Sequence, residues 1–250
     1  QNLLLEVDLL NNVFKENELI PNVKEIHLGG GTPSHLTVDE ITEILKSLER
    51  FVNFKNLKEF SMEIDPRTVS YDHFKEYKSL GVDRISFGVQ DFDPVVQKKI
   101  NREQPFEMIE KLMNHQLRKY FKGVNFDLLF GLPAQTIETF RKTIDLTNKL
   151  GPERITLIKY AHIPKKRKHL RMILEEDLPP EKDLPIMFLN STESLIRNGY
   201  SWVGIDHFAK KDDALSIAKD NGKVYRNFGG ETPGYTQDMI SLGPTSTSGF

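Results

Sequence analysis

The chain has 250 residues, of which 38% are hydrophobic and 28% charged, and its net charge is −2. This balance gives no electrostatic reason to expect nucleic acid or an anionic membrane as a partner, and no apolar run approaches the roughly 20 residues of a membrane-spanning helix. The absence of cysteine excludes disulfides and thiolate metal sites within these residues, and a cytoplasmic location is the default expectation.

Helical and extended patterns alternate almost from end to end of the chain. In chain order they predict helix 3–14, strand 24–28, helix 41–51, strand 58–64, helix 71–80, strand 84–89, helices 95–100 and 106–120, strand 123–130, helix 137–150, strand 154–160, helix 184–199 and strand 200–205. Strands that alternate with helices predict an α/β fold with a parallel sheet and right-handed crossovers. We expect such strands to be buried on both faces.

Local signals mark where several helices begin. Thr37 and Glu40 have the spacing of a capping box. Asp93 and Pro94 suit the N-cap and first position of the next predicted helix. After Tyr160 the pattern loosens into a charged, proline-rich segment and, beyond the last strand, a tail rich in Gly, Thr and Ser.

Polar or glycine residues follow five successive predicted strands. These stretches are "GGGTP" at 29–33, "EIDPR" at 63–67, "GVQDF" at 88–92, "NFDLLFGLP" at 125–133 and "KYAHIP" at 159–164. In parallel α/β folds the ligand binds at the carboxyl ends of the strands. The sequence therefore predicts one binding site at this rim.

Two carboxylates at the rim have competing interpretations. For Glu63, a structural ion pair with Arg67 or Arg84 is as good an explanation as a role in ligand binding. Asp127 lies inside the apolar stretch "VNFDLLF", where a carboxylate is costly unless it is paired or binds something. This cost favours a functional role for Asp127.

Other polar residues have plainer explanations. Gln90 and Asp91 are alternatively caps of the following helix. His162 and His207 are interpreted as structural histidines, and the basic run at 165–168 as a solvated loop.

The three glycines at 29–31 permit either a sharp turn with positive φ or the close approach of a ligand to the backbone. A phosphate loop does not fit, because no Lys follows at the spacing of that motif. Backbone carbonyls there can accept hydrogen bonds from an ammonium group. Glu63 and Asp127 can hold ribose hydroxyls, and Arg102 can pair with a carboxylate. Together these groups describe a site for an amino-acid nucleoside.

At this point the motifs "HLGGGTP", "EIDPR", "GVQDF", "NREQ", "DLLFGLP", "YAHIP", "GIDHFA" and "RNF" resemble those of the oxygen-independent coproporphyrinogen III oxidases, within the radical S-adenosylmethionine (radical SAM) enzymes. The resemblance covers essentially the whole chain. It implies an incomplete, three-quarter (β/α)6 barrel of six parallel strands, two S-adenosylmethionine molecules and a nearby [4Fe–4S] cluster.

Carried over by motif, the resemblance also implies site residues and a reaction. The positions that would contact S-adenosylmethionine are Gly30, Gly31, Thr32, Glu63, Gln90, Arg102, Asp127, Ala161 and Thr247. The reaction is the oxidative decarboxylation of two propionates of coproporphyrinogen III to vinyl groups, which gives the haem precursor protoporphyrinogen IX and requires an electron donor. No catalytic residue and no metal ligand is assigned.

The sequence departs from the family in four places. The family's C-x-x-x-C-x-x-C cluster motif would precede Gln1, and its C-terminal domain would follow Phe250. We therefore expect residues 1–250 to be the barrel core of a longer enzyme, without these two parts. Thr247 stands where the family tends to be aliphatic, and the stretch "KKRKHLR" does not match closely.

Two other function classes compete with the enzyme. One is a cluster-free S-adenosylmethionine- or tetrapyrrole-binding protein without catalysis, similar to haem chaperones. The other is a metal-free barrel hydrolase or aldolase. It fits worst, because Lys159 alone occupies a strand end suited to a Schiff base and no Ser–His–acid spacing stands out.

Overall fold

Seven strands form one sheet in the computed structural model, which describes residues 1–114, 117–166, 168–234 and 238–249. In chain order the strands are β1 (Glu25–Leu28), β2 (Glu59–Ile64), β3 (Arg84–Gln90), β4 (Gly123–Phe130), β5 (Arg154–Lys159), β6 (Tyr200–Val203) and β7 (His207–Lys210). Their order across the sheet is β1-β2-β3-β4-β5-β7-β6. Strands β1 to β5 thus lie side by side across the sheet in the same order as in the sequence.

The strand directions confirm most of the predicted parallel sheet. Strands β1 to β5 pair in parallel, and β6 runs in the same direction. The six predicted strands are thus all parallel, and the sheet also contains a strand that was not predicted, β7, which pairs antiparallel with both β5 and β6. Strands β6 and β7 form a hairpin, whose short turn begins at Gly204 with φ +62°, so no crossover helix separates them.

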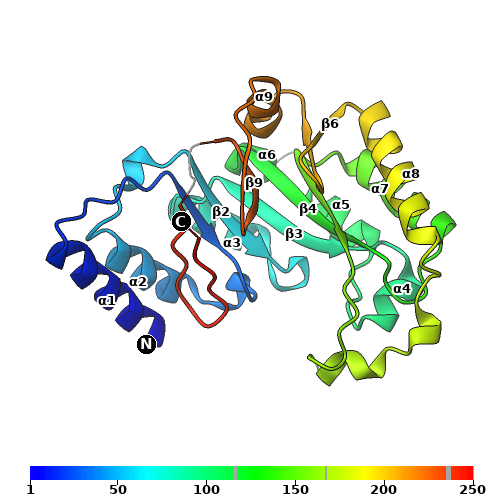
Figure 1. Cartoon of the computed structure of the whole chain (residues 1–250), viewed down its shortest axis with the longest axis horizontal. Helices are drawn as coiled ribbons and strands as arrows, with labels where there is room; N and C mark the ends of the chain where they lie inside the picture. Colours follow the sequence, from blue (N-terminus) through cyan, green and yellow to red (C-terminus); the bar gives the residue numbers. More distant parts are fainter. Residues whose placement is uncertain (115–116, 167, 235–237, 250) are drawn as a thin grey trace.

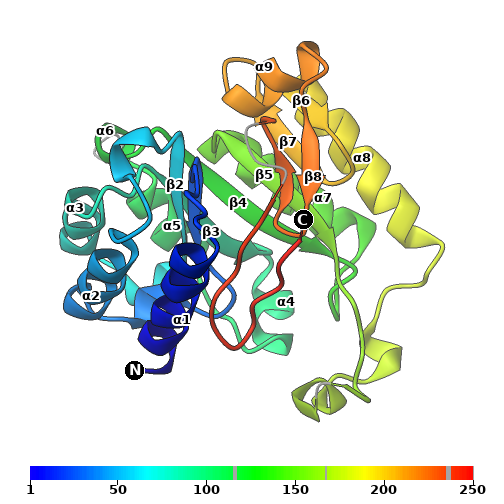
Figure 2. The ribbon, with the colours of Figure 1, turned by 60° about the vertical axis from the view of Figure 1, so that its left-hand side comes forward.

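Helices connect the parallel strands, as Figures 1 and 2 show. They are α1 (Asn2–Glu16), α2 (Val38–Leu48), α3 (Tyr71–Ser79), α4 (Pro94–Lys99), α5 (Phe106–Leu112), α6 (Leu117–Tyr120), α7 (Ile137–Leu150), α8 (Asp183–Arg197) and α9 (Ala214–Asp220). The predicted caps are confirmed: Thr37 and Glu40 form a reciprocal capping box on α2, and Asp93 accepts from the first amides of α4. Helices α1 and α2 lie beside β1, and α7 and α8 lie at the other end of the sheet (Figure 1).

The single helix predicted over residues 106–120 is wrong, because α5 ends at Leu112 and α6 begins at Leu117. Met113 leaves the helical conformation with ψ +12°, and the hydroxyl of Tyr71 on α3 donates to the carbonyl of Lys111. Residues 115–116 lie outside the described part of the chain.

The two faces of the sheet differ in polarity. The face toward the helices is apolar: Met62, Phe87 and Phe126 are fully buried there against residues such as Phe74 and Phe140. The alternate residues of β2 to β5 face the other way and are mostly polar: Glu59, Ser61, Glu63, Arg84, Ser86, Gly88, Asn125, Asp127, Arg154 and Thr156. The expected burial on both faces holds for β3 and β4, which have no exposed residue. One of these two faces is nevertheless polar, and the curved sheet encloses it.

Four charged side chains close the inner face at the amino ends of the strands. Arg84 donates to Glu59 at 3.0 Å and to Asp213 at 2.8 Å, and Arg154 donates to Asp213 at 2.8 Å and to Glu59 at 3.2 Å. Asp213 also caps α9 by accepting from the amide of Leu215. Burial opposes ionisation of Glu59, but the two guanidinium groups hold its pKa below the usual value. We call these four residues the basal ion network.

The last residues described lie beside the first helix. Strands β8 (Tyr225–Asn227) and β9 (Gly230–Thr232) form a separate hairpin, and Met239 pairs with Gly249 farther on. The amide of Gly243 donates to Glu6 Oε2 of α1 at 2.6 Å. This last segment, red in Figures 1 and 2, thus lies beside α1.

Candidate functional site

The loop after β1 holds the glycines at one edge of the inner face. Gly30 has φ +84°, and a Cβ there would collide with Thr245 Oγ1 of the C-terminal segment. Gly31 is not among the residues with positive φ, and a Cβ there would meet no described atom within 4 Å. Thr32 precedes the short helix Pro33–His35 and accepts from its last amide. A turn explains Gly30, whereas Gly31 lies beside open space.

Glu63, at the end of β2, contacts His27 of β1 rather than an arginine. The distance from His27 Nε2 to Glu63 Oε1 is 3.2 Å. Because a carboxylate can only accept, the ring donates from Nε2, and in a neutral ring Nδ1 then accepts from Ser61, at 2.9 Å. Arg67 pairs with Asp65, and Arg84 belongs to the basal ion network. The ion-pair interpretation of Glu63 is therefore wrong. The Glu63 side chain stays 39% exposed, free to take a further donor.

Asp127 lies on the inner face of β4, one strand beyond β3. It accepts from Ser86 Oγ and from Asn125 Nδ2, both at 2.8 Å. Burial raises the pKa of Asp127, the Ser86 hydroxyl opposes that rise, and the nearby Glu63 carboxylate adds to it. The buried carboxylate is thus hydrogen-bonded within the protein, and it is close enough to the Glu63 carboxylate to be affected by its charge.

Arg102 extends to the rim, near Asp127, from the loop after α4. Its Nε donates to the carbonyl of Gly88 at 3.0 Å, and its Nη1 lies 3.6 Å from Asp65 Oδ2. Burial lowers the pKa of Arg102, while Asp65 and Asp127 oppose that change. A guanidinium group therefore stands at the rim near two carboxylates, Asp65 and Asp127.

Gln90 ends β3 at an irregularity in its pairing with β4. Its φ is +65°, which is uncommon for a residue other than glycine. Its buried Oε1 has no hydrogen-bond partner within the described residues. The capping interpretation fails for Gln90 and Asp91, because Asp93 caps α4 and Asp91 is itself fully buried. A strained backbone and an unpartnered amide point to a ligand at this position.

Two of the expected site residues lie at the edges of the cluster. Ala161 is exposed just after β5, between Tyr160 and His162. The Tyr160 hydroxyl lies 3.2 Å from His162 Nδ1. Thr247 is exposed in the C-terminal segment, where its carbonyl accepts from Ser241. The described hydrogen bonds and ion pairs connect neither residue to Glu63, Asp127 or Arg102. Both assignments stay predictions.

A second polar cluster, near β7, is held together by contacts among its own side chains. His207 Nδ1 lies 2.7 Å from Asp206 and 2.9 Å from Glu231. Arg226 Nη1 lies 2.5 Å from Glu231 and 3.2 Å from Asp206. The His207 contact and Arg226 lower the pKa of Asp206 to about 2, against the effect of burial. These contacts fasten the β8–β9 hairpin to β7, as expected of a structural histidine.

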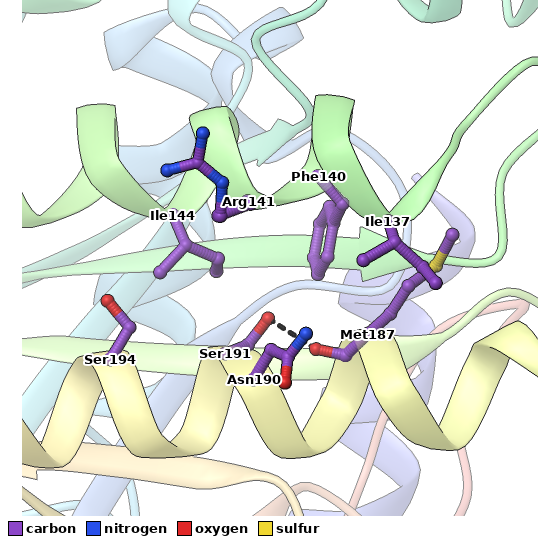
Figure 3. Close-up of a pocket in the computed structure, with 8 residues that line it drawn as sticks. All are labelled: Ile137, Phe140, Arg141, Ile144, Met187, Asn190, Ser191 and Ser194. Atoms are coloured by element: carbon purple, nitrogen blue, oxygen red, sulfur yellow. Dashed lines mark hydrogen bonds between the residues drawn. The ribbon is translucent and has the colours of Figure 1, made fainter.

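Two cavities lie away from the rim. Figure 3 shows one between α7 and α8, of ≈10 Å³, lined by Phe140, Ile144 and Met187, with Ser191 donating to the Met187 carbonyl. It has room for about one water molecule. A wider hollow of ≈390 Å³ lies on the helix side, between α2 and α3. Neither involves the residues of the candidate site.

The site fits S-adenosylmethionine but not an iron–sulfur cluster. The open space at Gly31, the unpartnered Oε1 of Gln90, the exposed Glu63 carboxylate and the Arg102 guanidinium match the ammonium, hydroxyl and carboxylate groups of an amino-acid nucleoside. A cluster needs thiolate ligands, and these 250 residues include no cysteine.

The sequence analysis overlooked four members of the site: His27, Ser86, Asn125 and Thr156. Asn125 links Ser86 to Asp127, and Thr156 lies 3.4 Å from Asn125. A signal was present, since polar residues alternate with large apolar ones in "EFSMEI", "RISFGV" and "NFDLL". That period of two marks a strand with one polar face.

The fold and the site define a class. The family model of the radical SAM superfamily matches residues 3–147, and the chain belongs to that superfamily. Members of the superfamily act with S-adenosylmethionine and, in general, a [4Fe–4S] cluster. The archaeal Elp3 of Methanocaldococcus infernus, at 17% identity and a TM-score of 0.58, shares the fold.

Within the superfamily, the chain is similar to coproporphyrinogen III oxidases in both sequence and structure. The chain is 39% identical over 242 residues to the oxygen-independent coproporphyrinogen III oxidase of Helicobacter pylori J99, covering 96% of the chain and 52% of that protein. It is 38% identical over 228 residues to the Escherichia coli K12 enzyme, covering 91% and 50%. The structure of coproporphyrinogen III oxidase (HemN) from Escherichia coli superposes with a TM-score of 0.90 at 34% identity, covering 99% of this chain and 56% of that one.

These matches confirm the resemblance and the fold class inferred from the motifs. The chain spans about half the length of the curated relatives it matches. Among the described residues, no helix is both long enough and apolar enough to cross a membrane.

Proposed function

We propose that this chain is the barrel core of a radical SAM enzyme that oxidatively decarboxylates coproporphyrinogen III to protoporphyrinogen IX. The observation that carries the proposal is the rim cluster of Gly31, Glu63, Gln90, Arg102 and Asp127, which fits an amino-acid nucleoside. It occurs in a chain whose relatives along nearly its full length are named coproporphyrinogen III oxidases.

Each rim residue has a chemical role in the proposal. The backbone at Gly30 and Gly31 accepts from the ligand's ammonium group, and Glu63 and Asp127 accept from ribose hydroxyls. Arg102 pairs with the ligand's carboxylate. Two S-adenosylmethionine molecules are proposed, and Gln90, Thr32, Ala161 and Thr247 complete the set of contacts around them.

In the proposed reaction each propionate loses a hydrogen atom, carbon dioxide and one electron. One hydrogen atom is removed from the side chain, the bond to the carboxylate breaks, and carbon dioxide and one electron leave, so that a vinyl group remains. Bound S-adenosylmethionine supplies the group that abstracts the hydrogen atom. An external donor provides the electron that starts the reaction, and an acceptor takes the electron released with carbon dioxide.

In this proposal the residues of this chain bind and orient S-adenosylmethionine, and other residues must hold the [4Fe–4S] cluster. We propose that thiolates outside residues 1–250 hold it and that a further domain completes the enzyme. A cytoplasmic location stays a prediction. A noncatalytic S-adenosylmethionine- or tetrapyrrole-binding protein is the less favoured reading, because the relatives are named oxidases.

The test uses the full-length protein, purified without oxygen and with its cluster rebuilt. Incubation with coproporphyrinogen III, S-adenosylmethionine and a chemical reductant should produce protoporphyrinogen IX and two equivalents of carbon dioxide. Omission of S-adenosylmethionine is the control. Binding of the tetrapyrrole without conversion, under conditions where the Escherichia coli enzyme turns over, would favour the noncatalytic reading.

A further inference from the structure

A buried polar network lies directly beneath the rim. It consists of Asp91, Gln97, Gln104, Gln135 and Thr143, and none of the five is more than 4% exposed. Burying a polar side chain is unfavourable unless its hydrogen-bonding groups find partners. So many buried polar groups at one place therefore call for a reason. We name this set the sub-rim network.

Gln97, on α4, ties two loops together with one amide. Its Nε2 donates to the carbonyls of Asp91 at 2.8 Å and Gln104 at 2.9 Å, and its Oε1 accepts from the amide of Gln104 at 3.0 Å. Its own carbonyl accepts from the amide of Arg102 at 2.8 Å. One side chain thus fixes the loop that carries Arg102 against the residue that follows Gln90.

Gln104 connects the same loop to β3. Its Nε2 donates to the carbonyl of Gly88 at 3.1 Å, and that carbonyl also accepts from Arg102 Nε at 3.0 Å. A Cβ at Gly88 would lie 2.9 Å from both Arg102 Nη2 and Gln90 Nε2. The guanidinium group and the amide therefore lie next to each other above the carbonyl that Gln104 holds.

Asp91 and Gln135 extend the network to β4 and α7. Gln135 Nε2 donates to Asp91 Oδ2 at 2.5 Å, and Thr143 donates to Asp91 Oδ1 at 2.9 Å. Gln135 Oε1 accepts from the amides of Gly131 and Leu132, at 2.7 and 3.0 Å, just past the end of β4. The network thus spans the ends of β3 and β4, which carry Gln90 and Asp127.

We propose that Gln97 and Gln104 are positioning residues, which hold Arg102 and Gln90 in the geometry that binds S-adenosylmethionine. This inference rests on the proposed function, since it assigns Arg102 and Gln90 to that ligand. Both side chains are at most 4% exposed, so the ligand does not approach them directly, although Gln104 Oε1 has no hydrogen-bond partner among the described residues. They act through the Gly88 carbonyl and the loop at 102–104.

The test measures S-adenosylmethionine affinity by calorimetry in the full-length protein, together with the midpoint of thermal unfolding. Gln97→Met keeps the side-chain length but removes three hydrogen bonds. Gln104→Met is the milder variant, removing the side-chain donor to the carbonyls of Gly88 and Val89 but not the backbone bonds. The matched control is Tyr200→Phe, which removes a buried hydroxyl that donates to Pro152 at 2.7 Å, far from the rim.

We expect Gln97→Met and Gln104→Met to weaken binding by about tenfold or more, while Tyr200→Phe lowers the unfolding midpoint without changing affinity. Unchanged affinity in folded Gln104→Met would overturn the inference, whatever its stability. Failure of the wild-type protein to bind S-adenosylmethionine would instead overturn the proposed function, so the two failures are distinct.

Discussion

His27 Nε2 lies 3.2 Å from Glu63 Oε1, directly over the backbone of Gly29. A Cβ at Gly29 would collide with the imidazole and lie 2.7 Å from the carboxylate oxygen. The first of the three glycines therefore makes room for a contact within the protein. Gly30 is required by its positive φ, and neither reason applies to Gly31.

Gly31→Ala should lower S-adenosylmethionine affinity by about tenfold or more while leaving stability nearly unchanged. The added methyl group points into open space where the ligand is expected. Gly30→Ala should instead destabilise the protein by about 1–2 kcal/mol, because its φ is +84°. Calorimetry and urea unfolding of both variants separate the two effects. Intact affinity in Gly31→Ala would contradict the assignment of this glycine to the ligand.

Glu63→Gln should weaken S-adenosylmethionine binding by about ten- to hundredfold, because a charge-assisted hydrogen bond contributes roughly 1.5–3 kcal/mol. The unfolding midpoint should change little, since the side chain is 39% exposed. Glu138→Gln is the control, since it breaks only an exposed pair with Arg141. A lowered midpoint with unchanged affinity would mean that Glu63 serves the fold.

Asp91 should make stability fall as pH rises from about 4 to 6. Burial raises the pKa of Asp91 from 3.8 to about 6, although its hydrogen bonds with Asp93, Gln135 and Thr143 oppose the rise. Between these values the folded state binds more protons than the unfolded state, so stability decreases with pH. Urea unfolding at pH 4 to 7 should show a shallower decrease for Asp91→Asn than for the wild type. Parallel curves would show that Asp91 titrates normally.

Arg154→Met should destabilise the protein by about 3–5 kcal/mol, because it leaves Glu59 and Asp213 buried with one guanidinium partner instead of two. The basal ion network lies at the opposite end of the strands from the ligand. Affinity for S-adenosylmethionine in the folded fraction should therefore equal that of the wild type. A selective loss of affinity would assign this network to the site.

Iron and sulfide analysis should find one [4Fe–4S] cluster in the anaerobically rebuilt full-length protein and none in residues 1–250 alone. The shorter chain has no thiolate to offer. Stoichiometric iron and sulfide on the shorter chain would disprove this prediction.

Local signals predicted most of the fold. The capping box at Thr37 and the Asp93–Pro94 start of α4 depend on residues a few positions apart, and both formed as expected. The helix over 106–120 failed because a long-range donor, Tyr71, reaches Lys111. Strand β7 was missed because its short, half-buried segment has no turn signal except Gly204.

The site was predictable only in part for a related reason. Glu63 and Asp127 could be placed at the rim because the strands that carry them are visible in sequence, whereas Arg102 lies in the loop after α4. Their partners could not, because the register of neighbouring strands decides them: Glu63 lies beside Ser86, and Gly88 beside Asp127. The sub-rim network also joins Asp91 to Thr143, 52 positions apart.

The hydrogen bond from Gly243 to Glu6 joins residues 237 positions apart, and Thr245 of the same segment lies against Gly30. During synthesis the strands of the rim leave the ribosome in order, N-terminal parts first. The wall beside the glycine loop, however, is added only when residues near 245 have emerged. A nascent chain stalled after β7 would therefore expose its rim without this wall.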